Sequence, residues 1–154
     1  MRRRWPGGGR GSGKGPVMAE LAGLNVVVVG LGPMGRGIAR IFAAAGATTT
    51  VVDRDEPTTV AAARALQDEA ETDGAPVTVQ PVADLATAVA DADLLVEAIL
   101  EDPAVKEEFL TRLAGVAGPD LVVASNTSSL SISELGRVFG CRLQNRAAPS
   151  VQQQ

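Results

Sequence analysis

The most informative segment of the sequence is Asn25-Val-Val-Val-Val-Gly30-Leu-Gly32-Pro-Met-Gly35. A short β-branched run closed by a glycine is typical of a strand that is buried on both faces of a parallel sheet. The three glycines have the spacing Gly-x-Gly-x-x-Gly, and apolar residues at helical spacing follow them. We therefore predict that a buried strand, a tight turn and a helix follow one another directly here.

The alternation of strand and helix continues along the chain. The predicted strands span 25–30, 48–52, 77–79, 94–98 and 121–124, and the predicted helices span 36–45, 57–72, 84–89, 103–117 and 131–139. Strands that alternate with helices indicate a parallel sheet covered on both faces. The predicted fold class is therefore α/β, a Rossmann-type doubly wound and mostly parallel sheet in a single domain.

The ends and the buried faces of these helices can also be predicted. Gly46 is expected to end the first helix, and Asp84 and Asp102 are expected to cap the third and fourth. The apolar stripes expected to face the sheet are Ile38, Ile41, Phe42 and Ala45 in the first helix and Val105, Phe109, Leu113 and Val116 in the fourth.

The composition divides the chain into three regions. Residues 1–17 are rich in Gly and Arg, cannot bury enough apolar area to order themselves, and are interpreted as a disordered leader. Residues 18–140 form the domain, and residues 141–154, which show no periodicity, form an irregular tail. An alternative for the leader is that Met18 is the true start of the protein.

Composition excludes several function classes. The chain has 154 residues, with 14 basic and 18 acidic side chains, no His and one Cys. Every charged residue before Met18 is basic, so the remainder is strongly acidic and unsuited to wrapping nucleic acid. A single Cys excludes a disulfide scaffold or a multi-Cys zinc site, and no metal site is expected. No apolar run reaches the roughly 20 residues needed to span a bilayer, and no secretory signal is recognisable, so we expect no membrane partner and a cytoplasmic location.

The glycine triplet predicts a dinucleotide site. Gly30 permits the tight turn, Gly32 lets the backbone approach a pyrophosphate, and Gly35 lets the helix pack closely on the strand. The amino end of the helix then offers free N–H groups to the phosphates. The expected cofactor-binding turn also includes Leu31, Pro33 and Met34. The alternative is a structural turn without a ligand.

An acidic residue lies at the expected distance from this turn. Asp53 ends the second predicted strand, 18 residues after Gly35, where a carboxylate accepts hydrogen bonds from the adenosine ribose. Its charge repels a 2′-phosphate and favours NAD over NADP, although the adjacent Arg54 weakens that preference. The alternative for Asp53 is a turn residue at a strand end.

Two further groups of polar residues follow predicted strands. Ser125-Asn-Thr-Ser-Ser-Leu130 comes after the fifth strand, where ligands of open α/β sheets bind, but Ser and Asn are also common turn formers. Glu97-Ala-Ile-Leu-Glu-Asp102 ends the fourth strand and precedes Lys106. From the residues alone, Glu101 and Lys106 are a solvated ion pair at the start of a helix.

These segments together resemble a known family. The segments Val28-Val-Gly-Leu-Gly-Pro-Met-Gly-Arg-Gly-Ile-Ala39, Leu94-Leu-Val-Glu-Ala98 and Ser125-Asn-Thr-Ser-Ser-Leu130 look like the amino-terminal domain of the 3-hydroxyacyl-CoA dehydrogenases, which include the 3-hydroxybutyryl-CoA dehydrogenases. The resemblance covers about 24–140, and the Ser-Asn-Thr-Ser-Ser run is its most specific part.

The resemblance implies NAD-dependent oxidation of a 3-hydroxyacyl-CoA to the 3-oxoacyl thioester in fatty acid metabolism. It implies that Glu101 and Lys106 contact the cofactor, and it therefore favours a binding role for them over an ordinary solvated ion pair. It also implies that Ser128 lies near the substrate's 3-oxygen and the nicotinamide, with Asn126 in the same pocket.

The sequence departs from the family in two ways. The family's catalytic His, in a His-Phe-Phe-Asn-Pro segment, and its helical dimerising domain have no counterpart in these 154 residues. An acid–base group of this kind contributes about 10²–10⁴-fold in rate. The stretch between Asp53 and Glu97 is also shorter than is usual for the family. The helical hairpin that contacts CoA in the family is therefore expected to be shortened in this chain.

We expect from these departures that the chain is incomplete and inactive alone, through a gene fragment or a frameshift near Gly140. The alternatives are a non-catalytic NAD-binding module and a subunit completed by a separate helical chain.

Overall fold

The computed structural model describes residues 21–72, 78–81 and 84–126. The predicted leader, the helix predicted at 131–139, the tail and Ser128 lie outside these residues. The elements are β1 (Asn25–Val29), α1 (Pro33–Ala44), β2 (Thr48–Val52), α2 (Glu56–Thr72), β3 (Thr78–Pro81), α3 (Leu85–Val89), β4 (Leu94–Glu97), α4 (Pro103–Val116) and β5 (Val122–Ser125).

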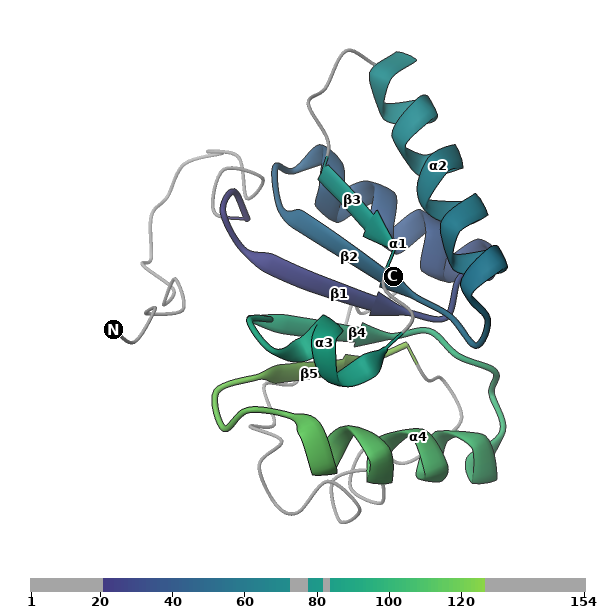
Figure 1. The fold of residues 1–154 in the computed structure, drawn as a ribbon, viewed down its shortest axis with the longest axis vertical. Helices are drawn as coiled ribbons and strands as arrows, with labels where there is room; N and C mark the ends of the chain where they lie inside the picture. Colours follow the sequence, from purple (N-terminus) through teal and green to yellow (C-terminus); the bar gives the residue numbers. More distant parts are fainter. Residues whose placement is uncertain (1–20, 73–77, 82–83, 127–154) are drawn as a thin grey trace, which may run out of the picture.

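The strands form one parallel sheet in the order β3-β2-β1-β4-β5, and helices cover both of its faces (Figure 1). The predicted α/β, doubly wound fold is therefore confirmed. β3 lies at the edge of the sheet, which is why it tolerates Pro81, a residue with no N–H to donate.

The order of the strands creates a switch point beside β1. The chain runs from β1 outward to β2 and β3, and then crosses to β4 and β5 on the other side. Val29 at the end of β1 is in register with Val52 on one side and with Glu97 on the other. Loops leaving β1 and β4 therefore diverge at the carboxyl edge, which is where such sheets form a ligand crevice.

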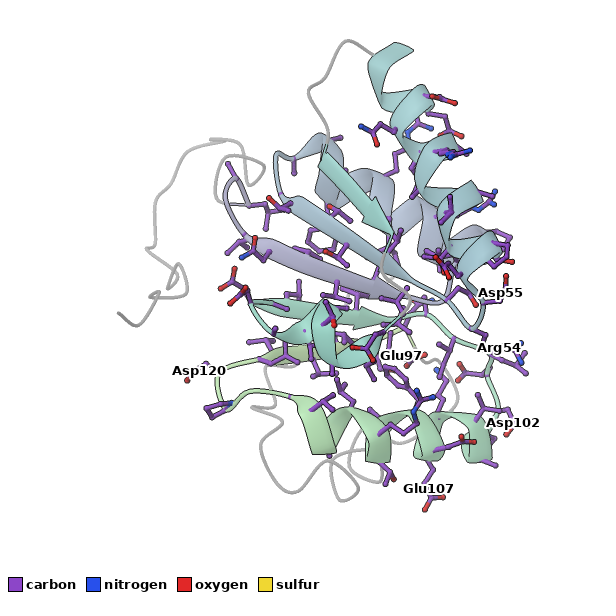
Figure 2. All side chains as sticks on the ribbon, in the orientation of Figure 1. Arg54, Asp55, Glu97, Asp102, Glu107 and Asp120 are labelled. Carbon is purple, nitrogen blue, oxygen red and sulfur yellow. The ribbon has the colours of Figure 1, made fainter. Side chains whose placement is uncertain are left out.

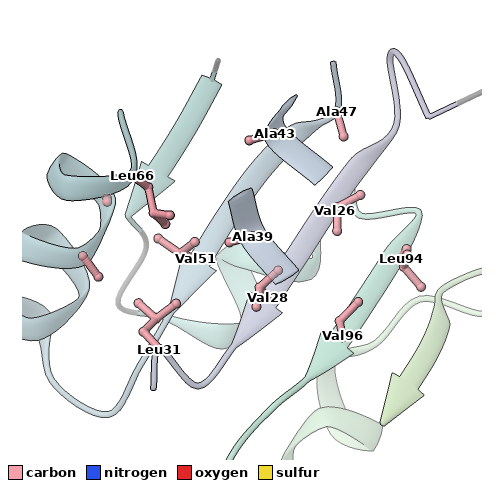
Figure 3. Close-up of a cluster of buried hydrophobic side chains, with 12 residues drawn as sticks. Val26, Val28, Leu31, Ala39, Ala43, Ala47, Val51, Leu66, Leu94 and Val96 are labelled. Carbon is pink, nitrogen blue, oxygen red and sulfur yellow. The ribbon is translucent and has the colours of Figure 1, made fainter. Parts of the chain in front are cut away.

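The core consists of one apolar layer on each face of the sheet. Val26 and Val28 of β1 pack with Ala39 of α1 and Leu66 of α2 on one face (Figure 3). Because side chains alternate along a strand, Val27 points to the opposite face. The apolar layer there also contains Leu85, Leu95, Leu110 and Leu113. The continuous valine run of β1 is thus explained by burial on both sides.

The predicted helix ends are confirmed. Gly46 follows α1 in a left-handed conformation, with φ +85°. The Asp84 carboxylate accepts a hydrogen bond from the N–H of Thr87, and that of Asp102 accepts hydrogen bonds from two N–H groups of the first turn of α4. α2 begins at Glu56, one residue earlier than predicted.

The predicted buried face of α1 is partly wrong. Ile41 is 59% exposed, and the residues that face the sheet are Gly35, Ala39 and Ala43. Small side chains let the helix lie close to the valine-rich strands. Ile38 and Phe42 pack against the flank of this layer instead, so the largest apolar side chains do not mark the centre of the contact.

The predicted stripe of α4 is also partly wrong. Lys106, Leu110 and Leu113 are the buried residues, whereas Val105 and Val116 are exposed. Phe109 is partly buried, and only Leu113 of the predicted stripe is fully buried. The buried face is therefore rotated toward Lys106, whose ion pairs beneath the helix are described below.

Candidate functional site

Two glycines of the turn after β1 are required by the packing of the protein itself. Gly30 has φ +91°, and its N–H donates to the carbonyl of Val52 at 2.9 Å. A Cβ on Gly30 would lie 2.6 Å from the carbonyl oxygen of Ala98, and one on Gly35 would lie 1.7 Å from that of Gly30. Neither position accepts a side chain, whether or not a ligand is bound.

Gly32 is different because no packing contact requires it. A Cβ added to Gly32 would meet no atom within 4 Å, and its backbone is extended, with φ −65° and ψ −176°. Gly32 is the N-cap of α1, where no side chain caps the first turn. A missing side chain in open space at a helix amino end leaves room for an anionic ligand to reach the backbone N–H groups.

Asp53 lies directly against this turn. Its carboxylate accepts the N–H of Leu31 at 2.7 Å and the N–H of Arg54 at 2.6 Å. Its own N–H donates to the hydroxyl of the buried Thr59 at 3.1 Å. A carboxylate has about four lone-pair positions, so two hydrogen bonds leave capacity for ribose hydroxyls. The structure thus brings the glycine turn and Asp53 together, as the sequence predicts.

The other residues predicted for the turn differ in what they can offer. The Leu31 side chain is buried in the core, so only its backbone faces the turn. Pro33 occupies the first position of α1 and has no N–H to donate. Met34 is exposed. Pro33 and the Met34 side chain can therefore contact a ligand only through apolar atoms, and Arg54 is an exposed cation beside Asp53.

A buried ion-pair cluster lies on the β4 side of the switch point. Lys106 is 1% exposed, and its Nζ lies 3.1 Å from both carboxylate oxygens of Glu97 and 3.0 Å from Oε2 of Glu101. Glu97 is 2% exposed, whereas Glu101 is 36% exposed. The interpretation of Glu101 and Lys106 as a solvated pair is therefore wrong for Lys106.

Glu97 is a central member of this cluster, although the sequence analysis quoted its segment and assigned Glu97 itself no role. Oε1 of Glu97 accepts the N–H of Ile99 at 2.8 Å, and Oε2 accepts the hydroxyl of Ser125. The sequence did contain a signal for Glu97: it is a carboxylate at the end of a strand whose other residues are apolar, as is typical of a buried strand. Such a group requires a partner, and Lys106 follows nine residues later.

The predicted substrate side lies at the same edge of the sheet. The N–H of Asn126 donates to the backbone carbonyl of Glu97 at 2.9 Å, which fixes the chain as it leaves β5. Ser128 lies outside the described residues. Of the two residues predicted for the reacting end, the structure places one beside Glu97.

Two exposed carboxylates cap helices of the domain. Backbone and side-chain hydrogen bonds from Thr58 hold the pKa of Asp55 below its ordinary value, and those from Thr87 do the same to the pKa of Asp84. Among the residues that the structure describes, no group of three or more His, Cys, Asp or Glu side chains could hold a metal ion. No helix of the described part is long and apolar enough to cross a membrane.

Comparisons with known proteins agree with this geometry. Residues 25–145 match the family model of the 3-hydroxyacyl-CoA dehydrogenase NAD-binding domain. Human mitochondrial hydroxyacyl-coenzyme A dehydrogenase is 34% identical over 128 residues, which cover 72% of this chain and 41% of that protein. The chain therefore spans about two fifths of the length of the curated relatives it matches.

Two more relatives show the range of the similarity. The 5-formyl-3-hydroxy-2-methylpyridine 4-carboxylate 5-dehydrogenase of Mesorhizobium japonicum is 32% identical over 121 residues, covering 72% of this chain and 39% of that protein. The structure of 3-hydroxybutyryl-CoA dehydrogenase from Escherichia coli K12 superimposes with a TM-score of 0.63 at 30% identity, covering 73% of this chain and 26% of that one.

Proposed function

Because the chain belongs to the 3-hydroxyacyl-CoA dehydrogenase family as its NAD-binding domain, we propose that it supplies the cofactor half of an enzyme that oxidises 3-hydroxyacyl-CoA to 3-oxoacyl-CoA. Bound NAD+ would supply the acceptor for the hydride from C3 of the substrate, and a base would take the hydroxyl proton. The observation that supports cofactor binding most strongly is Gly32, whose missing side chain serves no packing purpose at the amino end of α1.

The adenosine half of the cofactor is assigned to the β1–β2 side. The turn of Gly30, Leu31, Gly32, Pro33, Met34 and Gly35 would surround the pyrophosphate. Its donors would be the backbone N–H groups of Gly32, Met34 and Gly35, because those of Gly30 and Leu31 already donate to Val52 and Asp53. Asp53 accepts hydrogen bonds from the ribose hydroxyls and disfavours a 2′-phosphate. Arg54 offsets part of that repulsion, so the preference for NAD over NADP is expected to be clear but finite.

The nicotinamide half is assigned to the β4–β5 side. Glu101 is the most exposed member of the ion-pair cluster and is proposed to contact the cofactor. Lys106 is held by two carboxylates and is proposed to fix Glu101 in place. Asn126 and Ser128 are proposed to bind the substrate oxygen near the nicotinamide.

The resemblance to the family implies that the base that takes the hydroxyl proton is an imidazole. The 154 residues include no His, so an imidazole base must come from another segment or another chain. The chain by itself is therefore expected to bind NAD(H) without sustained turnover. Such a domain could operate as one segment of a longer chain, together with a separate helical chain that supplies the base, or in a purely NAD-binding role.

Titration of the purified chain with NADH and with NADPH tests the proposal. We expect NADH to bind and NADPH to bind at least tenfold more weakly, with no steady oxidation of NADH when 3-oxobutyryl-CoA is added. Equal affinity for the two cofactors contradicts the role of Asp53, and absence of NADH binding contradicts the proposed function. Steady turnover contradicts the requirement for an external base.

A hydroxylated substrate without CoA is the second candidate. The Mesorhizobium relative, whose name indicates a pyridine substrate, is almost as similar to this chain as the human CoA enzyme is. The short stretch between Asp53 and Glu97 also leaves little chain for a CoA-contacting hairpin. Calorimetry of the NADH complex with 3-oxobutyryl-CoA and with a CoA-free 3-oxo acid separates the two, because the leading proposal requires tighter binding of the thioester.

The metabolic setting is part of the same proposal. A role in fatty acid metabolism follows from the acyl-CoA substrate, and the cytoplasm is the proposed compartment. Since some relatives are mitochondrial by name, fractionation of the native cells against compartment markers is the direct test.

A further inference from the structure

The burial of the Glu97 carboxylate costs free energy of folding. It ends β4, all four residues of which are buried, and its carboxylate is 2% exposed. Removing a carboxylate and an ammonium from water costs several kcal/mol for each ion, and a well-packed apolar pair of similar size is often at least as stable. The Glu97–Lys106 pair is therefore poorly explained by stability alone.

The contacts of Glu97 connect three separate elements at the carboxyl edge of the sheet. Its carboxylate binds the N–H of Ile99 in the β4–α4 loop, the Nζ of Lys106 in α4 and the hydroxyl of Ser125 at the end of β5. Its backbone carbonyl also accepts the N–H of Asn126. The Glu97 side chain thus links the β4–α4 loop, the first turn of α4 and the end of β5 on the β4–β5 side of the crevice.

The two halves of a dinucleotide reach different sides of this crevice. Asp53 directly follows β2 and Glu97 ends β4. Both strands flank β1, whose following turn is the proposed site of the pyrophosphate. A dinucleotide binds across the switch point with one nucleotide on each side. With the adenosine half at Asp53, the nicotinamide half must lie over the ends of β4 and β5, next to the segments that Glu97 holds.

From this arrangement we propose that Glu97 is a positioning residue for the nicotinamide half of the cofactor. It acts through the β4–α4 loop, Lys106 and the end of β5, and it touches neither cofactor nor substrate. The adenosine half does not depend on it. This inference rests on the proposed function only in the assignment of the nicotinamide to the β4–β5 side.

The test compares two ligands on the same variants. NADH contains both halves of the cofactor, whereas ADP-ribose lacks the nicotinamide. For Glu97→Gln, which keeps the size of the side chain and removes its charge, we expect the Kd for NADH to rise at least tenfold and the Kd for ADP-ribose to change less than twofold. The fluorescence enhancement of bound NADH, which reports the nicotinamide environment, should fall in parallel.

Ser125→Ala is the second variant, because it removes one contact of Glu97 and leaves the buried ion pair intact. We expect a smaller loss, about threefold, again confined to NADH. Glu107→Gln is the matched control: Glu107 lies on the same helix as Lys106 but points away from the sheet (Figure 2), and its substitution should change neither affinity.

The outcomes separate this inference from the proposed function. Equal losses of NADH and ADP-ribose affinity in both variants, or unchanged NADH affinity in both, overturn the role of Glu97. If Glu97→Gln does not fold, the Ser125→Ala result decides between these outcomes. Failure of the unsubstituted chain to bind NADH overturns the cofactor function itself.

Discussion

The same missing methyl group has three different consequences at Gly32, Gly35 and Gly37. At Gly35 an added Cβ would lie 1.7 Å from a backbone carbonyl oxygen, so the fold requires glycine there. At Gly32 and Gly37 an added Cβ meets no atom within 4 Å. Gly37 lies within α1, whereas Gly32 caps it, so only Gly32 has a position from which a side chain could block a ligand.

We predict that Gly32→Val weakens NADH binding at least 100-fold and lowers the free energy of unfolding by no more than about 1 kcal/mol, because valine is a poorer N-cap than glycine. The valine side chain occupies the space through which the pyrophosphate reaches the backbone N–H groups. Calorimetric titration and urea denaturation measure the two quantities.

Gly37→Ala provides the control on the same helix. Alanine in a helix interior is more stable than glycine by about 1 kcal/mol, so this variant should be stabilised and should bind NADH normally. If Gly32→Val binds NADH as well as Gly37→Ala does, the open space at Gly32 has no role in cofactor binding.

Asp53 is predicted to set both cofactor choice and the shape of the turn. Because its carboxylate accepts the N–H of Leu31, removing it disturbs the turn and not only the ribose contact. For Asp53→Asn we expect NADH affinity to fall about tenfold and NADPH affinity to change little, since the repulsion of a 2′-phosphate is lost while Arg54 remains. Parallel titrations give the ratio of the two affinities, and an unchanged ratio would contradict the assignment.

At the scale of single elements, local chemistry made the boundaries predictable. Gly46 ends α1 and Asp102 caps α4 because each needs only its immediate neighbours in the chain to do so. The buried faces were less predictable, because a face is chosen by what lies across from it. Ile41 is exposed because smaller residues of α1 fit better against the valine layer. Lys106 is buried because its ammonium group pairs with the carboxylate of Glu97 beneath α4.

The caps of the helices predict a loss of stability in acid. The folded-state pKa values of Asp55 and Asp84 lie below their unfolded values, owing to hydrogen bonds from Thr58 and Thr87. Their contribution is therefore complete above the unfolded pKa, near pH 4, and is lost as the pH falls through the lower folded-state values.

Urea midpoints measured from pH 7 to pH 2 test this pH dependence. Asn caps a helix about as well as Asp but carries no titrating group, so Asp84→Asn should show a smaller decrease below pH 4 than the unsubstituted chain does. Identical decreases in the two proteins would show that the cap at Asp84 contributes nothing to the acid sensitivity.

The ion pair between β4 and α4 gives a prediction in which stability and binding separate. Lys106→Met leaves Glu97 buried without its buried counter-charge, and we expect a loss of about 3–5 kcal/mol in the free energy of unfolding. The double variant Glu97→Leu/Lys106→Met removes both charges and should recover at least half of that loss.

The double variant should not recover NADH affinity, because Ile99 and Ser125 still lack the carboxylate that positions them. Denaturation and NADH titration of both variants measure the two effects. Recovery of affinity together with stability would mean that the cluster serves the fold alone.

For the whole molecule, a part of the site could be predicted from the sequence only when its residues belong to one local unit of the chain. The glycine turn and Asp53 belong to one strand–helix–strand unit, so their spacing alone predicts that they meet. The role of Glu97 depends on partners in α4 and β5, which only the completed sheet brings together. A pattern along the chain shows the charges but not their pairing.

Hydrogen exchange measured by mass spectrometry, with and without saturating NADH, tests how the site is distributed over the molecule. Every predicted contact lies at the carboxyl edge, so exchange should slow in peptides covering 30–36, 53–55 and 97–101. The amino edge serves as the internal control: there the N–H of Asn25 donates to the carboxylate of Asp93 at 2.8 Å, and no ligand contact is expected. Because parallel strands bring all their carboxyl ends to one edge, protection confined to the amino edge would contradict the placement of the crevice. Protection at 30–36 and 53–55 without any at 97–101 would limit the bound cofactor to its adenosine half and contradict the assignment of the nicotinamide to the β4–β5 side.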